Sequence, residues 1–256
     1  RFCVTIDLVR GGAPLSEVEA ESNQKMRREI FGPPSARRDV IVWHRIKDFQ
    51  MMSMKLISEQ LLLGCPSAAN LDRLDLFIPG ELPRQRLTFS RRIVVFASPN
   101  NPGALTVAKD LALATGNCIE VTSDKTNSTI THFLLYLNDQ TYSNSAGKEL
   151  AEELRMAGAV QGSSGSTIEI VTVHENDPER GGCEFGIFFD GRTPKDLVDG
   201  GIYNAIAQAL FSGRFWPVSA ALVAKAMGAT ITTGSHSRSF TTASALRAEL
   251  QCSLRA

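Results

Sequence analysis

The stretch RIVVFASPNNPG, residues 92–103, decides the fold class of this 256-residue chain. Residues 92–97 form a continuous apolar run after the leading arginine, which predicts a strand buried on both faces of a sheet. Small polar residues then replace the apolar ones, and Pro102-Gly103 opens a predicted helix over residues 104–114. A buried strand that leads directly into a helix is the unit from which parallel sheets are built.

The same unit repeats along the chain after residue 90. Further strands are predicted at residues 119–122, 132–137 and 168–173, and a predicted helix over 146–159 follows the third strand. Strands that alternate with helices predict an α/β fold, a three-layer sandwich around a central, mainly parallel sheet of the flavodoxin-like type.

The C-terminal part of this core contains one ambiguous segment and two predicted helices. Residues 184–189 fit either a fifth strand or an apolar turn of helix. Thr193 as N-cap and Pro194 at the first helical position predict a helix that runs to about Phe211. A last helix is predicted over residues 218–227.

The first 90 residues lack this alternation and are predicted to form an α+β extension packed on the core. It is expected to contain a strand at 2–9, helices at 16–30 and 39–63, and a proline-rich connector over 64–90 with a short strand at 74–78. The predicted organisation is an extension over 1–90, an α/β domain over 91–228, and a tail over 229–256 with one short helix at 243–250.

Charge and cysteine content limit the classes of partner. Lys plus Arg and Asp plus Glu both number 27, so no net charge attracts nucleic acid and no nucleic-acid partner is predicted. The 5 cysteines are dispersed without metal-ligand spacing, which favours a reducing, cytoplasmic compartment and predicts no metal site. No apolar run approaches the roughly 18–20 residues of a membrane-spanning helix. Because the sequence starts at Arg1, we expect it to be a fragment of a larger protein.

Polar residues follow three of the predicted strands at the point where each apolar run ends. Ligands bind outside the carboxyl ends of the strands in open parallel sheets, so these residues are candidates for a binding site. Turn formation alone also favours Asn, Asp, Ser and Pro at these positions, and this alternative stays open. The candidate binding residues are Ser98, Pro99, Asn100, Asn138, Asp139, His174 and Glu175.

Two glutamates on the helix after the third strand are candidates for catalysis. Glu149 and Glu153 are four residues apart and therefore share one face of the helix. A carboxylate there is suited to bind a sugar hydroxyl or to stabilise a developing cation, although glutamate is also common on solvated helix faces. The fingerprints GxGxxG and GxxxxGK[ST] are absent, so the common dinucleotide and phosphate-loop sites are not predicted.

The order of elements resembles the TIR domains of Toll, interleukin-receptor and plant resistance proteins over about residues 91–211. The segments that carry the resemblance are RRIVVFASPNNPG, THFLLYLNDQTYSNSAGKELAEEL and IEIVTVHENDPERGGCEFGIFF. In those TIR domains that cleave NAD at the nicotinamide–ribose bond, a glutamate on the helix after the third strand is the catalytic residue, and the resemblance implies the same role for a glutamate here. Glu153 matches that position best, Glu149 is the competing register, and Ser98 and Asn100 would line the cleft.

The resemblance also implies which partners the domain has, and the sequence differs from TIR domains at one connection. Self-association and contacts with other TIR-like domains are expected, with NAD as a substrate and no bound cofactor. Only residues 125–131 separate the second and third predicted strands, which is too short for the loop and helix that TIR domains carry there. We therefore expect a signalling or protein-interaction module with NAD hydrolysis as its activity, and the alternative is a non-catalytic nucleotide or small-molecule sensor.

Overall fold

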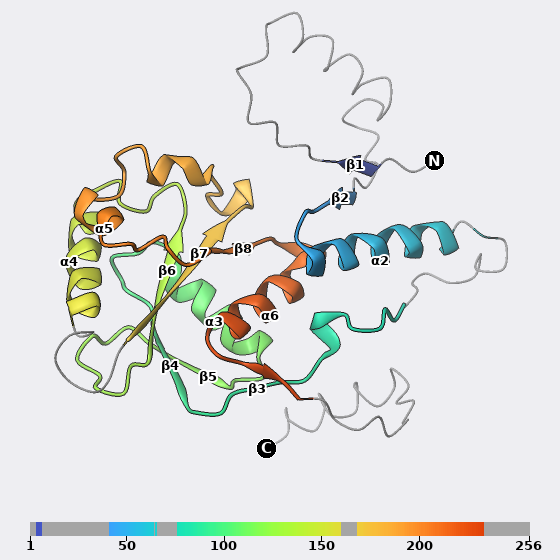
Figure 1. The fold of residues 1–256 in the computed structure, drawn as a ribbon, viewed down its shortest axis with the longest axis horizontal. Coiled ribbons are helices and arrows are strands. Elements are labelled where there is room, and N and C mark those ends of the chain that lie inside the picture. The colour runs from blue at the N-terminus through green and yellow to red at the C-terminus, as the bar shows by residue number, and fades with distance from the viewer. Residues whose placement is uncertain (1–3, 7–40, 64, 66–75, 160–167, 233–256) are drawn as a thin grey trace, which may run out of the picture.

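A five-stranded parallel sheet forms the centre of the molecule (Figure 1). The computed structural model describes residues 4–6, 41–63, 65, 76–159 and 168–232. The strand order is β5-β4-β6-β7-β8, and every neighbouring pair is parallel. This is the order of a doubly wound flavodoxin-like sheet, so the predicted α/β class is confirmed. The strands are β4 (Ile93–Phe96), β5 (Ile119–Thr122), β6 (His132–Leu137), β7 (Glu169–Glu175) and β8 (Gln208–Leu210).

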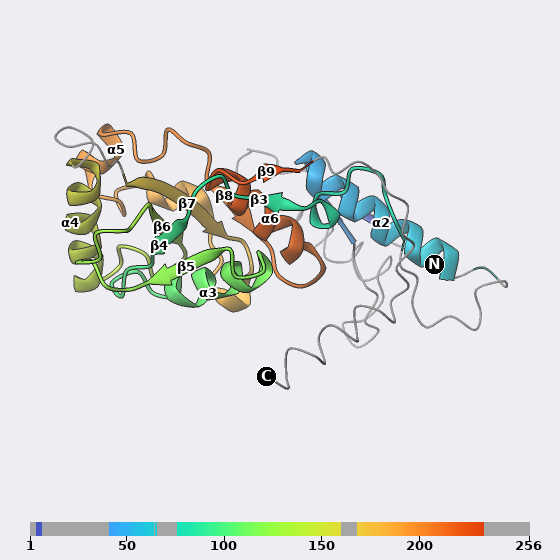
Figure 2. The same cartoon turned by 90° about the horizontal axis from the view of Figure 1, so that it is seen from below.

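Helices cover both faces of this sheet (Figures 1 and 2). On one face, α3 (Ala104–Ala114) and α6 (Trp216–Ala226) pack on side chains such as Val95 and Leu134. On the other face, α4 (Ser145–Ala159) and α5 (Lys195–Asp199) pack on Phe96, Phe133 and Leu135. Successive residues of β4 and β6 thus bury their side chains on opposite faces, which is why these strands are apolar throughout.

Gly147 in the first turn of α4 sets how closely this helix approaches the loop before it. A Cβ atom added there would lie 2.5 Å from the Cα atom and 2.8 Å from the carbonyl carbon of Tyr142, which are backbone atoms. Tyr142 itself has a positive φ of 62°. The absence of a side chain at Gly147 therefore allows the close contact that positions α4 and its glutamates.

Replacing Gly147 by alanine is expected to destabilise the protein, although alanine normally stabilises a helix by about 1 kcal/mol relative to glycine. Overpacking against backbone atoms costs about 1–3 kcal/mol, which exceeds this gain, so the net effect on stability is a loss. The measurement is the midpoint of thermal unfolding, which should fall by several degrees. Gly186→Ala is the matched control, because a Cβ atom there has no neighbour within 4 Å. An unchanged or higher midpoint for Gly147→Ala would contradict the expectation.

The N-terminal part of the described chain lies beside α6. β1 (Val4–Ile6) pairs in parallel with β2 (Ile41–Trp43), and α2 (Lys47–Leu63) follows. The predicted helix over 39–63 is therefore wrong at its start, because the β-branched and aromatic residues 41–43 form a strand. The side chains of His44, Phe49, Phe211 and Phe215 form one aromatic cluster that joins this part to the core.

A short two-stranded sheet completes the described fold. β3 (Leu87–Thr88) pairs antiparallel with β9 (Thr230–Ile231) after a 3-10 turn at Leu82–Arg84. Residues 76–78, the described part of the strand predicted at 74–78, form no strand. The predicted helices at 16–30 and 243–250 lie outside the described residues.

The helix predicted over residues 193–211 is wrong in length and in its cap. α5 ends at Asp199, Gly201 has a positive φ of 83°, and residues 208–210 form β8 instead. Thr193 does not cap the helix, since its hydroxyl forms a 2.6 Å hydrogen bond with the hydroxyl of Tyr203. Residues 185–188 form a 3-10 helix, so the helical alternative for 184–189 is the correct one. Within the described ranges, no helix has the length and apolar character needed to cross a membrane.

Candidate functional site

The carboxyl ends of β4, β6 and β7 meet at one edge of the sheet, where hydrogen bonds hold their loops together. The side chain of Asn101 donates to the carbonyl oxygen of Tyr136 and accepts from its backbone N–H, both at 2.8 Å. The Asn138 amide donates to the carbonyl oxygen of Pro102 at 2.8 Å. The polar residues at the ends of β4 and β6 are therefore joined by hydrogen bonds. Two of these bonds come from the buried side chain of Asn101, which directly follows the candidate residues Ser98, Pro99 and Asn100.

Glu153 on α4 is the carboxylate that the loop after β4 binds. The Ser98 hydroxyl donates to Glu153 Oε2 at 2.5 Å, and the Asn100 side-chain amide donates to Glu153 Oε1 at 3.0 Å. The backbone N–H of Asn100 donates in turn to the Ser98 hydroxyl oxygen at 3.0 Å. Both carboxylate oxygens are thus fixed by one loop, and we call Ser98, Asn100 and Glu153 the glutamate clasp.

An open pocket of about 340 Å³ lies beside the clasp on the α4 face of the sheet, with Glu153 in its lining. This volume falls within the roughly 300–1,000 Å³ typical of small-molecule sites. Its apolar walls include Phe96 and Phe133, whose rings lie edge to face with centroids 5.1 Å apart, and the exposed side chain of Met156. Lys125 also lines this pocket.

The pocket exists because the connection between β5 and β6 contains no helix. Residues 123–131 cross β4 as two consecutive turns, in which the side chains of Asp124 and Asn127 accept hydrogen bonds from the backbone N–H groups of Thr126 and Thr129. The short spacing in the sequence predicted this missing helix. Because this connection has no helix, its residues Lys125, Thr126 and Ile130 form the wall of the pocket next to Phe96 at the end of β4.

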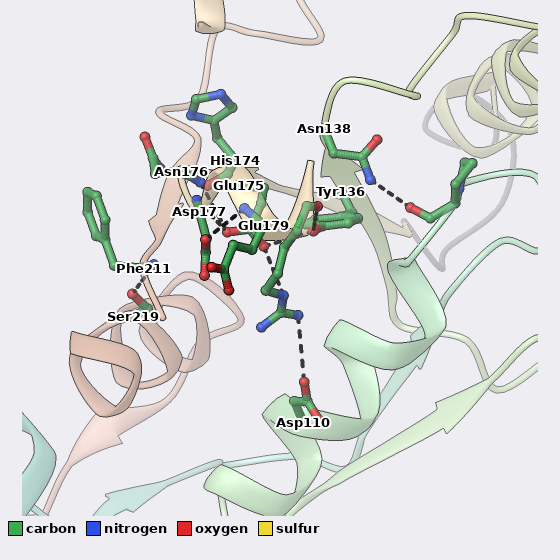
Figure 3. Close-up of polar contacts among 12 residues, drawn as sticks. Asp110, Tyr136, Asn138, His174, Glu175, Asn176, Asp177, Glu179, Phe211 and Ser219 are labelled. Atoms are coloured by element: carbon green, nitrogen blue, oxygen red, sulfur yellow. Dashed lines mark hydrogen bonds and ion pairs between the residues drawn. The ribbon is translucent and has the colours of Figure 1, made fainter. Parts of the chain in front are cut away.

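Glu175 at the end of β7 (Figure 3) lies on the face of the sheet opposite to α4. It is almost completely buried, at 1% exposure. It accepts a hydrogen bond from the Tyr136 hydroxyl at 2.8 Å and lies 3.4 Å from the guanidinium of Arg180. The backbone N–H groups of Asn176 and Asp177 also donate to it, at 3.1 and 3.0 Å. Burial and the bond to Glu175 raise the pKa of Tyr136 above its ordinary value. Glu175 therefore anchors the loop after β7.

His174 faces away from Glu175, as neighbouring residues of a strand do (Figure 3). Its Nε2 atom is 2.8 Å from the carbonyl oxygen of Cys183, and its ring packs edge to face on Phe185 with centroids 5.3 Å apart. Burial lowers the pKa of His174 below the ordinary value. His174 is thus a neutral packing residue at neutral pH and does not belong to the glutamate clasp.

The remaining predicted residues lie at the rim without joining the clasp. Glu149 is exposed one turn before Glu153, and Pro99 is exposed next to Ser98. Asp139 is exposed and its backbone N–H donates to the carbonyl oxygen of Gly181 at 2.8 Å. Sequence reasoning missed Tyr136 and Arg180, because an apolar strand residue and a loop arginine give no signal that they share a carboxylate.

The site combines a carboxylate in fixed orientation with an aromatic-lined pocket, a combination that suits a ligand with hydroxyl groups and a planar ring. In the part of the chain that the structure describes, no group of three or more His, Cys, Asp or Glu side chains is placed to hold a metal ion. Comparisons with protein-family models, with curated proteins and with solved structures find no match to this chain.

Proposed function

We propose that this domain is a TIR-like signalling module that binds NAD beside Glu153 and hydrolyses its nicotinamide–ribose bond. The observation that carries the proposal is the glutamate clasp next to an open apolar pocket. A glutamate on a solvated helix face has no need of two side-chain donors from a strand-end loop. Their presence here supports a carboxylate held ready for a ligand.

The pocket walls fit the nicotinamide half of NAD. The nicotinamide ring of NAD is planar, and it would pack on the apolar wall that the exposed Met156 and the largely buried rings of Phe96 and Phe133 form. The carboxylate of Glu153 accepts hydrogen bonds only, so its remaining lone pairs suit the ribose hydroxyl groups. The negative charge of Glu153 also compensates the positive charge of the ring.

The chemical step follows from this placement. The bond between the ribose C1′ atom and the ring nitrogen breaks, and its electron pair goes to the nitrogen, so neutral nicotinamide leaves. The ribose is left as an oxocarbenium-like cation, which the Glu153 carboxylate stabilises at short range. A water molecule then adds to C1′ and loses a proton, which yields the ribose hydroxyl. Ser98 and Asn100 act as positioning residues, since they hold the carboxylate toward the sugar.

A second candidate function is NAD or nucleotide sensing without turnover. The observation that favours it is that both oxygens of Glu153 already accept hydrogen bonds from the chain itself. The carboxylate thus has hydrogen-bond partners in the absence of a ligand. This also fits a site that binds NAD without cleaving it and whose occupancy changes the partners of the domain.

Incubation of the full chain with NAD and detection of nicotinamide by chromatography separates the two candidates. Release above the spontaneous rate supports hydrolysis. A rise in the unfolding temperature with NAD but no release supports the sensor, because a ligand that binds only the folded state stabilises it. If NAD is neither cleaved nor bound, both candidates fail.

A further inference from the structure

A second cavity, of about 510 Å³, lies at the carboxyl ends of β7 and β8, between these strands and the segment after β2. It shares no lining residue with the pocket beside Glu153. The carboxyl edge of a parallel sheet is where ligands of such folds bind. The proposed NAD cleavage uses none of its residues, so this cavity is free to take a ligand of its own.

One wall of the cavity is aromatic. Trp43 and the rings of Phe211 and Phe215 line it. The ring of His44 packs against both phenylalanines, with centroids 4.4 Å from Phe211 and 4.6 Å from Phe215. These contacts fix the wall in place with its rings tilted by 56–73° to one another, so a planar ring of a ligand can pack on one of them.

Another part of the lining, which we call the acceptor wall, consists of hydrogen-bond acceptors in a loop that Glu175 holds. Asn176 and Asp177 line it, and both of their backbone N–H groups are fixed by Glu175. The Asp177 carboxylate accepts from the backbone N–H of Glu179 at 3.0 Å, and the bond from the Ser212 side chain is the largest of the contacts that lower its pKa. Figure 3 shows Asn176, Asp177 and Phe211 on the same side of β7.

The side-chain amide nitrogen of Asn176 donates to the carbonyl oxygen of His174 at 3.0 Å, which fixes the orientation of the amide. An ionised carboxylate has no donor, so Asp177 accepts hydrogen bonds only. Arg45 lines the same cavity and its side chain is exposed, so the cavity combines an acceptor wall with a cation at its rim.

We propose that this cavity binds a guanine nucleotide, with the base on the aromatic wall, its N–H edge on Asp177 and its phosphate near Arg45. Guanine presents two adjacent N–H donors on one edge, and a carboxylate accepts such a pair with both oxygens. Adenine presents one donor beside an acceptor nitrogen, which a carboxylate repels. The acceptor wall therefore selects guanine over adenine.

The test is calorimetric titration of the full chain with guanosine monophosphate and, separately, with adenosine monophosphate. Guanosine monophosphate should bind, and adenosine monophosphate should bind at least about 10-fold more weakly, because a site built for particular donors leaves its polar groups unpaired with the wrong base. Asp177→Asn should lower the affinity for guanosine monophosphate by at least about 10-fold. The variant should keep its fold, since asparagine is also a good cap for the 3-10 helix Pro178–Arg180. The unfolding temperature of the variant checks the fold directly.

Two control variants test whether the nucleotide binds in this cavity and not elsewhere on the chain. Glu179→Gln changes an exposed neighbour of the same turn that does not line the cavity, and it should leave the affinity unchanged. Glu153→Gln should also leave it unchanged, so the result stands whether or not NAD is cleaved at the other pocket. Absence of binding at millimolar guanosine monophosphate, or equal affinity for both nucleotides, or a fully folded Asp177→Asn chain with the affinity of the wild type, overturns the proposal.

Discussion

Replacing Glu153 by glutamine is expected to reduce nicotinamide release from NAD by at least about 100-fold, which is the usual effect of removing a group that stabilises transition-state charge. Glutamine keeps the size of the side chain and one acceptor oxygen, so Ser98 and Asn100 retain a partner while the negative charge is lost. The measurement is the initial rate of nicotinamide formation at saturating NAD. Because the charge acts on the cation that develops during bond cleavage, kcat should fall more than the affinity for NAD.

Glu149→Gln is the matched control for this prediction. Glu149 lies one turn earlier on the same helix, is exposed, and does not line the pocket. Its replacement removes the same charge from α4 without touching the clasp, so the rate should stay within about 2-fold of the wild type, as for surface substitutions away from a site. Equal losses in both variants would contradict the assignment of Glu153, and so would full activity of Glu153→Gln.

The clasp also predicts a graded effect for its two positioning residues. Ser98→Ala and Asn100→Ala each remove one donor to Glu153 and leave the carboxylate in place. Each should therefore lower the rate by less than Glu153→Gln does. The combination of both should approach the effect of Glu153→Gln, because groups that act as a unit are not additive.

The sheet was predictable from the sequence because its central strands are buried on both faces. Residues 93–96 and 132–137 are almost entirely apolar and are buried throughout, and the structure has strands over these ranges. β8 was not predictable in this way, since Gln208–Leu210 is short and its first two residues are only half-buried. Its place as the fifth strand depends on pairing with β7, which local sequence does not encode.

The candidate site also contains residues that the sequence predicted and residues that it did not. Ser98 and Asn100 were selected because they follow a predicted strand, and Glu149 and Glu153 because they share one helix face. Only the resemblance to TIR domains favoured Glu153, which contacts Ser98 and Asn100 in the structure. The partners of Glu175 were not predictable, because Tyr136 is 39 positions away and lies inside an apolar strand. The sequence alone therefore presented Glu175 as a ligand residue, whereas in the structure its carboxylate binds other parts of the chain.

Replacing Glu175 by alanine is expected to lower the free energy of unfolding by about 3 kcal/mol, the cost of removing one partner from a buried charged pair. Four donors lose their acceptor: the Tyr136 hydroxyl, the Arg180 guanidinium and the backbone N–H groups of Asn176 and Asp177. Arg180 is partly exposed and also lies 3.7 Å from Asp110, so it retains a second partner and solvent. The measurement is urea unfolding, with exposed Glu179→Ala as the control that should change stability by less than about 0.5 kcal/mol.

Tyr136→Phe isolates one part of this effect. It removes the hydroxyl but keeps the ring, and it should cost about 1–2 kcal/mol, because a hydrogen bond to a charged group is lost. In the double variant, the two losses should not add, since the Tyr136 hydroxyl has no carboxylate to bind once Glu175 is gone. Strict additivity, or a loss below about 1 kcal/mol for Glu175→Ala, would show that the carboxylate does not hold the loop. Because that loop also carries Asn176 and Asp177, Glu175→Ala should weaken guanosine monophosphate binding as well, although Glu175 itself lines neither pocket.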